Sequence, residues 1–237
     1  MPKKSKRSLI VSLVCFLVLC PLTAVLGALF LKSRSYYLIA VVMIFEAIVP
    51  FFFYFEHRKI KTSELVTVAV MVSLCVVSRI FFVFLPQVKP MCAFVVVTGC
   101  VFGANVGFVT GALSVFISNF AFGQGMFTPF QMLAMGLCGF FAGLIFYKKD
   151  AVKNRLTVAL SGAALCFFVY GFLVDTCSVL MLDAVGSINE AVGIYASGVI
   201  FNLIHAVTTF IVLMLIIKSM NDKLSRLRIK YGIFAYQ

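Results

Sequence analysis

Long apolar runs separated by short charged or polar stretches dominate the chain. The runs cover residues 9–31, 36–55, 65–85, 91–122, 131–147, 156–182 and 191–217. Most are close to the length of about 20 residues that an α-helix needs to cross a bilayer, and none alternates apolar with polar positions as a barrel strand does. Lipid offers the backbone no hydrogen bonds, so each run must satisfy its own as a helix. The pattern predicts an all-α polytopic membrane protein.

The run at 91–122 is too long for one straight span and short for two full ones. A break at Gly103–Gly107 gives about eight transmembrane helices in all, with both termini in the cytoplasm. Sixteen lysines and arginines then face the cytoplasm, against Lys32, Arg34 and Lys89 outside. A single long span would put the basic loop near residue 150 outside, which the positive-inside rule disfavours. The charge pattern therefore favours two short helices.

A charged stretch at 56–64 marks the main division of the chain. It separates an N-terminal two-helix hairpin, residues 1–60, from a six-helix core, residues 61–237. The first apolar run could instead be a signal peptide, because small residues occur at 24–28. It is long for a signal sequence and a second run follows almost at once, which favours a retained helix.

Composition agrees with a membrane protein and excludes several functions. The chain is 63% hydrophobic and 12% charged, with a mean hydropathy of +1.12. A net charge of +12 could suggest nucleic acid, but the basic residues lie at the ends of apolar runs, as membrane orientation requires. The eight cysteines lie in apolar stretches without CxxC spacing and are interpreted as small core residues. With neither a GxxxxGK[ST] loop nor an HExxH motif, we expect no catalytic residues, metal or cofactor.

Four ionisable residues fall inside predicted spans, where an unpaired charge is costly. Arg79 and Asp175 lie at similar predicted depths below the outer face, so they could form a structural ion pair or contact substrate directly. Both interpretations stay open. For Glu46 and for His205, which has Asn202 one turn before it, packing and hydrogen bonding are favoured.

Small residues recur in two places. Gly99, Gly103, Gly107 and Gly111 repeat every four residues, which favours close helix packing, with some of them free to serve the predicted break. Ala69 and Ser73 form a similar pair on the cytoplasmic half of their span.

The uncharged segment 118–131 at the predicted outer face combines amides, a hydroxyl and four phenylalanines. Gly123 and Gly125 permit unusual backbone angles, and Pro129 can stand near the start of the next helix. Aromatic surfaces with a few directed polar groups are typical of small-molecule pockets. An ordinary re-entrant connector is the alternative.

Residues 85–146 resemble the substrate-binding (S) components of energy-coupling-factor (ECF) vitamin transporters, most closely the cobalamin group. The matching pieces are Leu85–Pro90, the glycine series, Ser118-Asn119, Gly123–Gly125 and Thr128–Met132. The resemblance implies a six-helix core in the bacterial cell membrane that binds its vitamin at the outer face. It also implies that Ala69 and Ser73 dock onto a transmembrane coupling subunit powered by two ATPase subunits. The N-terminal hairpin is a departure from the minimal six-helix form.

On this hypothesis the chain is a binding subunit without enzymatic activity. Its expected substrate-binding residues are Arg79, Lys89, Asn119, Gln124, Thr128, Gln131 and Asp175. The amides and hydroxyl would hydrogen-bond the vitamin, and Arg79 or Lys89 could meet a phosphate or carboxylate on it.

Two alternatives remain at the level of sequence. One is a stand-alone secondary transporter that uses Glu46, Arg79 and Asp175 as a coupling relay, although no repeat of the kind many such carriers have is evident. The other is a membrane enzyme with Asp175 and His205 as acid and base.

Overall fold

The computed structural model describes residues 61–147, 154–182, 184 and 187–234, together with isolated positions between residues 10 and 46. Within these residues every regular element is a helix, which confirms the all-α prediction. The main helices are α4 (Thr62–Phe81), α5 (Met91–Phe102), α6 (Ala104–Phe122), α7 (Phe127–Phe146), α8 (Arg155–Ala164), α9 (Phe172–Met181) and α10 (Ile188–Tyr231). A π-helical segment, Leu165–Gly171, joins α8 to α9.

Five stretches among these residues are long and apolar enough to cross a membrane. They are α4, α6, α7, the continuous stretch Arg155–Met181, and α10, while α5 is an apolar helix of only 12 residues. The chain is therefore a polytopic helical membrane protein. The total of eight helices and the cytoplasmic placement of both termini stay predictions.

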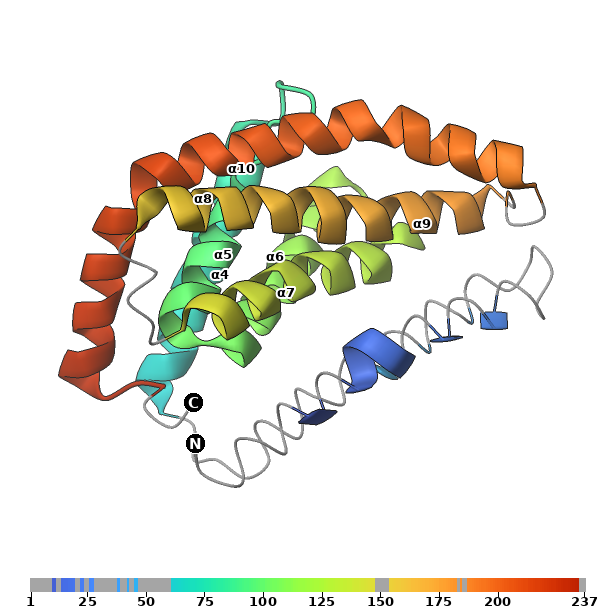
Figure 1. The fold of residues 1–237 in the computed structure, drawn as a ribbon. Helices are drawn as coiled ribbons and strands as arrows, with labels where there is room; N and C mark the ends of the chain where they lie inside the picture. The colour runs from blue at the N-terminus through green and yellow to red at the C-terminus, as the bar shows by residue number, and fades with distance from the viewer. Residues whose placement is uncertain are drawn as a thin grey trace.

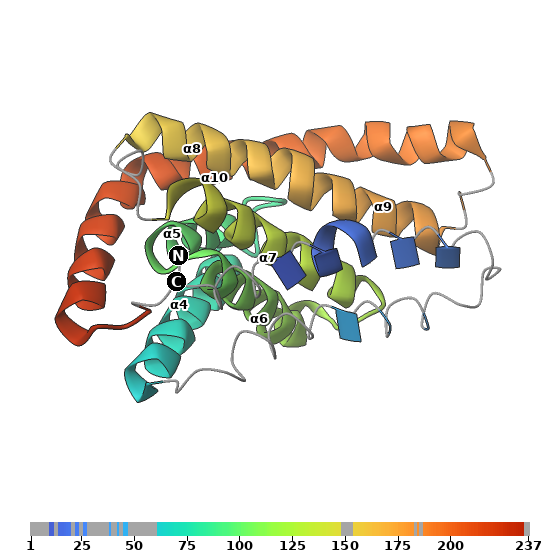
Figure 2. The ribbon, with the colours of Figure 1, turned by 60° about the horizontal axis from the view of Figure 1, so that its bottom comes forward.

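The helices form a layered bundle in which α5 and α7 lie in the middle (Figures 1 and 2). On one side they pack against α4 and α6, and on the other against α10 and the stretch from α8 to α9. Helix α10 runs back along α8 and α9 before its C-terminal part bends away toward the start of α4 (Figure 1). The middle helix α5 is almost entirely buried, which explains how so short a helix is stable.

The predicted break in the run 91–122 is confirmed, and it lies at one residue. Gly103 has φ of +100°, a conformation that side-chain-bearing residues rarely adopt, and it separates α5 from α6. The other glycines of the series pack against α7: a Cβ atom at Gly99 or Gly107 would collide with the backbone carbonyl of Gly139. The prediction of close packing is therefore confirmed.

Three predicted helix ends were wrong. Helix α4 ends at Phe81, before the predicted 85, because residues 82–85 form turns ahead of Pro86. Helix α7 begins at Phe127 rather than 131, so Pro129 is its third residue, where a missing N–H breaks no helical bond. Helix α10 continues past 217 to Tyr231, because its basic residues favour helix, and it stops at Gly232 in a left-handed conformation.

The C-terminal turn closes one end of the bundle. The Lys61 ammonium donates to the Gly232 carbonyl at 3.0 Å, and the Phe234 N–H donates to the Glu64 carboxylate at 2.7 Å. The predicted N-terminal hairpin, residues 1–60, lies mostly outside the described residues. Where it is described, the Thr23 hydroxyl donates to the Glu46 carboxylate at 2.5 Å, which places these two positions side by side.

Candidate functional site

Arg79, in the last turn of α4, lies buried with 6% of its surface exposed. Its Nη1 atom donates to Ser118 Oγ at 2.5 Å and to Asn119 Oδ1 at 2.7 Å, both on α6. Its guanidinium also lies 4.5 Å from the centre of the Phe122 ring. Among the described residues, this buried guanidinium is thus held by neutral groups.

Asn119 links three helices. It is fully buried, and while its oxygen accepts from Arg79, its Nδ2 donates to Thr128 Oγ1 at 3.2 Å and to Gln131 Oε1 at 3.1 Å. These bonds use both amide protons of Asn119. In this state the Asn119 side chain therefore orients the side chains of Arg79 and Gln131.

Thr128 and Gln124 extend the network into the loop between α6 and α7. The Thr128 hydroxyl donates to Gln124 Oε1 at 3.0 Å and accepts from the Gly125 N–H at 3.2 Å. The exposed Gln124 side chain in turn donates to the Phe116 carbonyl at 2.9 Å. These contacts brace a loop in which Gly123 has φ of +99°.

Five of the predicted substrate-binding residues therefore form one connected group. We call it the Arg79 network: Arg79, Ser118, Asn119, Gln124, Thr128 and Gln131. It joins α4, α6, α7 and the loop at 123–126.

Lys89 lies in the loop between α4 and α5, partly buried, and donates to Gln87 Oε1 at 3.2 Å. Burial, followed by repulsion from the Arg79 guanidinium, lowers the pKa of Lys89 to about 8. The sixth predicted residue is therefore electrostatically coupled to the Arg79 network.

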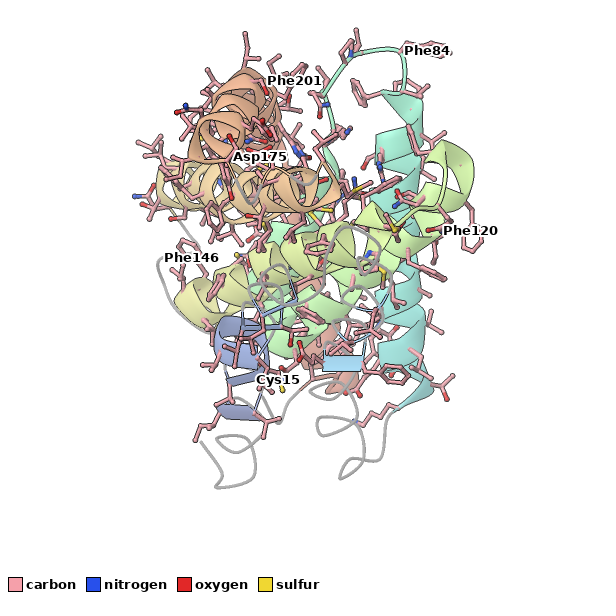
Figure 3. All side chains as sticks on the ribbon, turned by 90° about the vertical axis from the view of Figure 1, so that its right-hand side faces the viewer. Cys15, Phe84, Phe120, Phe146, Asp175 and Phe201 are labelled. Carbon is pink, nitrogen blue, oxygen red and sulfur yellow. The ribbon has the colours of Figure 1, made fainter. Side chains whose placement is uncertain are left out.

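Asp175 occupies a different place. It is half-buried on α9, where its Oδ2 accepts from Asn202 Nδ2 of α10 at 2.7 Å and its carboxylate packs against Gly198. No ion pair joins Arg79 to Asp175, although both are described. Figure 3 shows Asp175 among α9 and α10, and Phe120, the neighbour of Asn119, on the opposite side of the bundle. The pair that sequence depth suggested is not formed.

The residues of the two alternative hypotheses are also dispersed. Glu46 bonds Thr23, Arg79 bonds α6, and Asp175 bonds Asn202, so the proposed relay is not connected in this structure. His205 packs edge-on against Tyr170, with ring centroids 5.0 Å apart, and in the described part of the chain no hydrogen bond joins it to Asp175. Packing roles thus suit Glu46 and His205 here.

Sequence reasoning missed that His205, which packs against Tyr170, reaches the Lys89 loop. His205 on α10 is 2% exposed and interacts with the Lys89 backbone, and the π-helical segment carries Tyr170 against it. A π-helical turn is often found at functional sites, but a sequence gives no period from which to predict one.

The predicted docking residues Ala69 and Ser73 lie on the exposed face of α4. The Ser73 hydroxyl donates to the Ala69 carbonyl at 2.8 Å, so it presents no unpaired proton to a partner. Exposed apolar neighbours Val66, Val70 and Val77 continue this face.

Seven of the eight cysteines are described, and all seven are free and buried, as expected of core residues. Across the described part of the chain, no group of three or more histidine, cysteine, aspartate or glutamate side chains is arranged to hold a metal ion.

A family model described as "ECF-type riboflavin transporter, S component" matches residues 59–222, more than half of the chain. No curated protein and no solved structure matches the chain.

Proposed function

The chain belongs to the ECF-type riboflavin transporter S-component family, and we propose that its Arg79 network forms the vitamin-binding site of this subunit. Membership of a transport family supports a binding subunit over an enzyme. S components act in a membrane with a transmembrane coupling component and ATPase components, which fits a chain that lacks a nucleotide-binding loop of its own.

The observation that carries this proposal is a hydrogen-bonded network that connects a buried arginine to several polar side chains within a largely apolar bundle. Buried polar groups in a membrane protein are costly and mark substrate pathways. Here a guanidinium, two amides and two hydroxyls converge from α4, α6 and α7. On the predicted topology this end of the bundle faces outward, where an importer of the bacterial cell membrane must capture its substrate.

Riboflavin is the first candidate substrate, because the family description names it. Cobalamin is the second, from the resemblance of residues 85–146. One specific feature favours it: Arg79 and Lys89 supply two cations at the same end of α4, and a cation suits the phosphate of cobalamin, whereas riboflavin is neutral.

Calorimetric titration of the purified full chain in detergent tests the function directly. We expect submicromolar binding of riboflavin or cobalamin, with thiamine and biotin as controls. Asn119→Ala and Gln124→Ala should each weaken that binding while membrane insertion is unchanged. Failure of all four vitamins to bind would reject the function, and unchanged affinity in both variants would place the site elsewhere.

The exposed face of α4 is the proposed docking surface for the coupling component. Ala69 and Ser73 keep this face shallow enough for a partner helix to approach closely. Ala69→Trp or Ser73→Trp should abolish co-purification with the coupling component while vitamin binding persists. Val199→Trp, on the exposed face of α10, is the matched control and should leave both intact.

A further inference from the structure

The C-terminal part of α10 extends beyond the apolar run that precedes it. The helix has 44 residues, or about 66 Å at 1.5 Å per residue, whereas the hydrocarbon core of a bilayer is about 30 Å thick. Charged residues begin at Lys218, so residues 218–231 lie outside the hydrocarbon core. In Figures 1 and 2 this part turns away from the line of the rest of α10. It therefore begins at the membrane surface, on the side that the charge pattern predicts to be cytoplasmic.

One face of this segment packs against the bundle and fixes its orientation. Leu224 is 8% exposed and belongs to the hydrophobic core, and Met220 packs against that core from one turn earlier. One turn after Leu224, the Arg228 guanidinium donates to the Val101 carbonyl of α5 at 2.6 Å and lies 5.4 Å from the centre of the Tyr147 ring. The opposite face of the segment is thus held toward the outside of the molecule.

That outward face carries three cations. Lys223, Arg226 and Lys230 are exposed and stand at positions i, i+3 and i+7, which share one side of an α-helix; we call these three residues the basic stripe. None of them forms an ion pair within the residues that the structure describes, and Lys230 Nζ lies 5.3 Å from the centre of the Tyr231 ring. Leu227 and Tyr231, which are 40% and 51% exposed, stand four residues apart directly beside the basic stripe.

Cations beside exposed apolar side chains match the chemistry of an anionic membrane surface. Residues 218–231 contain five lysines and arginines and one aspartate, which gives a net charge of +4. A basic cluster of this size next to a membrane-spanning helix attracts anionic lipid headgroups. Leucine and tyrosine side chains suit the boundary between headgroups and acyl chains, where their apolar parts leave water. A soluble acidic partner would pair with the cations but would not explain the apolar residues beside them.

We propose that the basic stripe binds anionic lipid headgroups of the leaflet in which α10 ends, with Leu227 and Tyr231 inserted beside them. This lipid site is separate from the proposed vitamin site. The Lys61–Gly232 hydrogen bond places the end of α10 at the start of α4, whereas Arg79 lies in the last turn of α4. Lipid binding and vitamin binding can therefore be tested independently.

Tryptophan fluorescence tests the lipid site, because the chain contains no tryptophan of its own. The full-length Leu227→Trp variant is reconstituted in mixed bilayers in which either phosphatidylglycerol or phosphatidylcholine carries bromine atoms that quench tryptophan. We expect quenching to show a preference of about fivefold or more for phosphatidylglycerol, the effect of one cation near an anionic surface. Leu215→Trp, at a position 74% exposed in the apolar part of α10, is the matched control, and both lipids should quench it equally.

Removal of the charges tests whether the basic stripe causes the preference. In the Leu227→Trp chain, Lys223→Gln, Arg226→Gln and Lys230→Gln together should make quenching by the two lipids equal. Lys223→Arg, Arg226→Lys and Lys230→Arg together should retain the preference, and added salt should weaken it. The three side chains are exposed, so the charge-free variant should fold, and its melting temperature in detergent checks this.

Two results would overturn the lipid site. One is equal quenching by both lipids in the Leu227→Trp chain, and the other is a preference that survives loss of all three cations. Equal quenching combined with failure of the charge-free variant to co-purify with the coupling component would assign the basic stripe to an acidic protein surface instead.

Discussion

Arg79 and Asp175 are both ionisable residues inside the helical bundle, and the structure surrounds them very differently. Arg79 is buried and held by two α6 side chains, one of which bonds two further residues of α7. Asp175 is half-buried and has one recorded side-chain partner, Asn202. The first belongs to a network and the second to a pair.

This difference separates two reasons for keeping a charged residue in a membrane protein. A carboxylate at a helix contact can be satisfied by one amide and the remaining solvent or lipid headgroups. A buried guanidinium with neutral partners and an unpaired Nε is satisfied only in part, so it keeps a donor with which a bound molecule can pair. Connectivity and unpaired donors, rather than the presence of a charge, distinguish the candidate binding site.

The largest effect is expected from Arg79→Gln. This change removes the cation and leaves Ser118 and Asn119 without their charged donor, and each charge-assisted bond contributes about 1.5–3 kcal/mol. Affinity for the bound vitamin should fall by about a hundredfold in calorimetric titration. Arg79→Lys, which keeps the charge and loses the planar geometry, should recover part of the affinity. Wild-type affinity in Arg79→Gln would remove the network from the site.

The two asparagines provide a matched comparison. Asn119→Ala removes one hydrogen bond from each of Arg79, Thr128 and Gln131, at about 0.5–1.5 kcal/mol for each neutral bond and about 1.5–3 kcal/mol for the bond to Arg79. It should lower the melting temperature in detergent clearly and weaken vitamin binding by about tenfold. Asn202→Ala breaks one bond, to Asp175, and should alter vitamin affinity by less than about twofold. Equal effects of the two changes on binding would contradict the distinction drawn above.

Much of this site was predictable from the sequence, for identifiable reasons. Asn119, Gln124, Thr128 and Gln131 are close in the chain, so one helix turn and one loop bring them together. The glycine break at Gly103 was predictable because the run was too long for one span.

The rest depended on tertiary packing. Similar predicted depth suggested that Arg79 and Asp175 pair, but depth gives position along the membrane normal and says nothing of which side of the bundle a helix occupies. His205 reaches Lys89 from α10 while it packs against Tyr170 of the π-helical segment, and apolar periodicity does not reveal this packing. The length of α10 was missed because hydropathy marks the end of an apolar run, not of a helix.

Binding of a phosphate-bearing ligand should also depend on pH through Lys89. With a pKa of about 8, lowered from its ordinary value by burial and Arg79, Lys89 is mostly charged at pH 7 and mostly neutral at pH 9. The phosphate of cobalamin is a diester, so the ligand keeps its single negative charge over this range. Affinity for cobalamin should therefore fall by up to about tenfold from pH 7 to pH 9.

Arg79 stays charged from pH 7 to pH 9, so the change in affinity comes chiefly from Lys89. The other titratable groups near Lys89 are the Cys166 thiol and the His205 ring. The Lys89→Gln variant distinguishes the contribution of Lys89 from those of its neighbours, because its affinity should be independent of pH if Lys89 is the titrating group. Persistence of the full pH dependence in Lys89→Gln would assign it to another group.

The smallest effect is expected from Asp175→Asn, the counterpart of the first prediction. An asparagine has nearly the same shape as aspartate and can still accept from Asn202 through its oxygen, so the α9–α10 contact should persist. Since Asp175 lies outside the Arg79 network, vitamin affinity should stay within about twofold of wild type, near the limit that calorimetry resolves. A large loss would restore Asp175 to the substrate-binding residues that the sequence suggested. It would also mean that the ligand reaches across the bundle from α6 to α9, a span that a large vitamin such as cobalamin covers more readily than riboflavin.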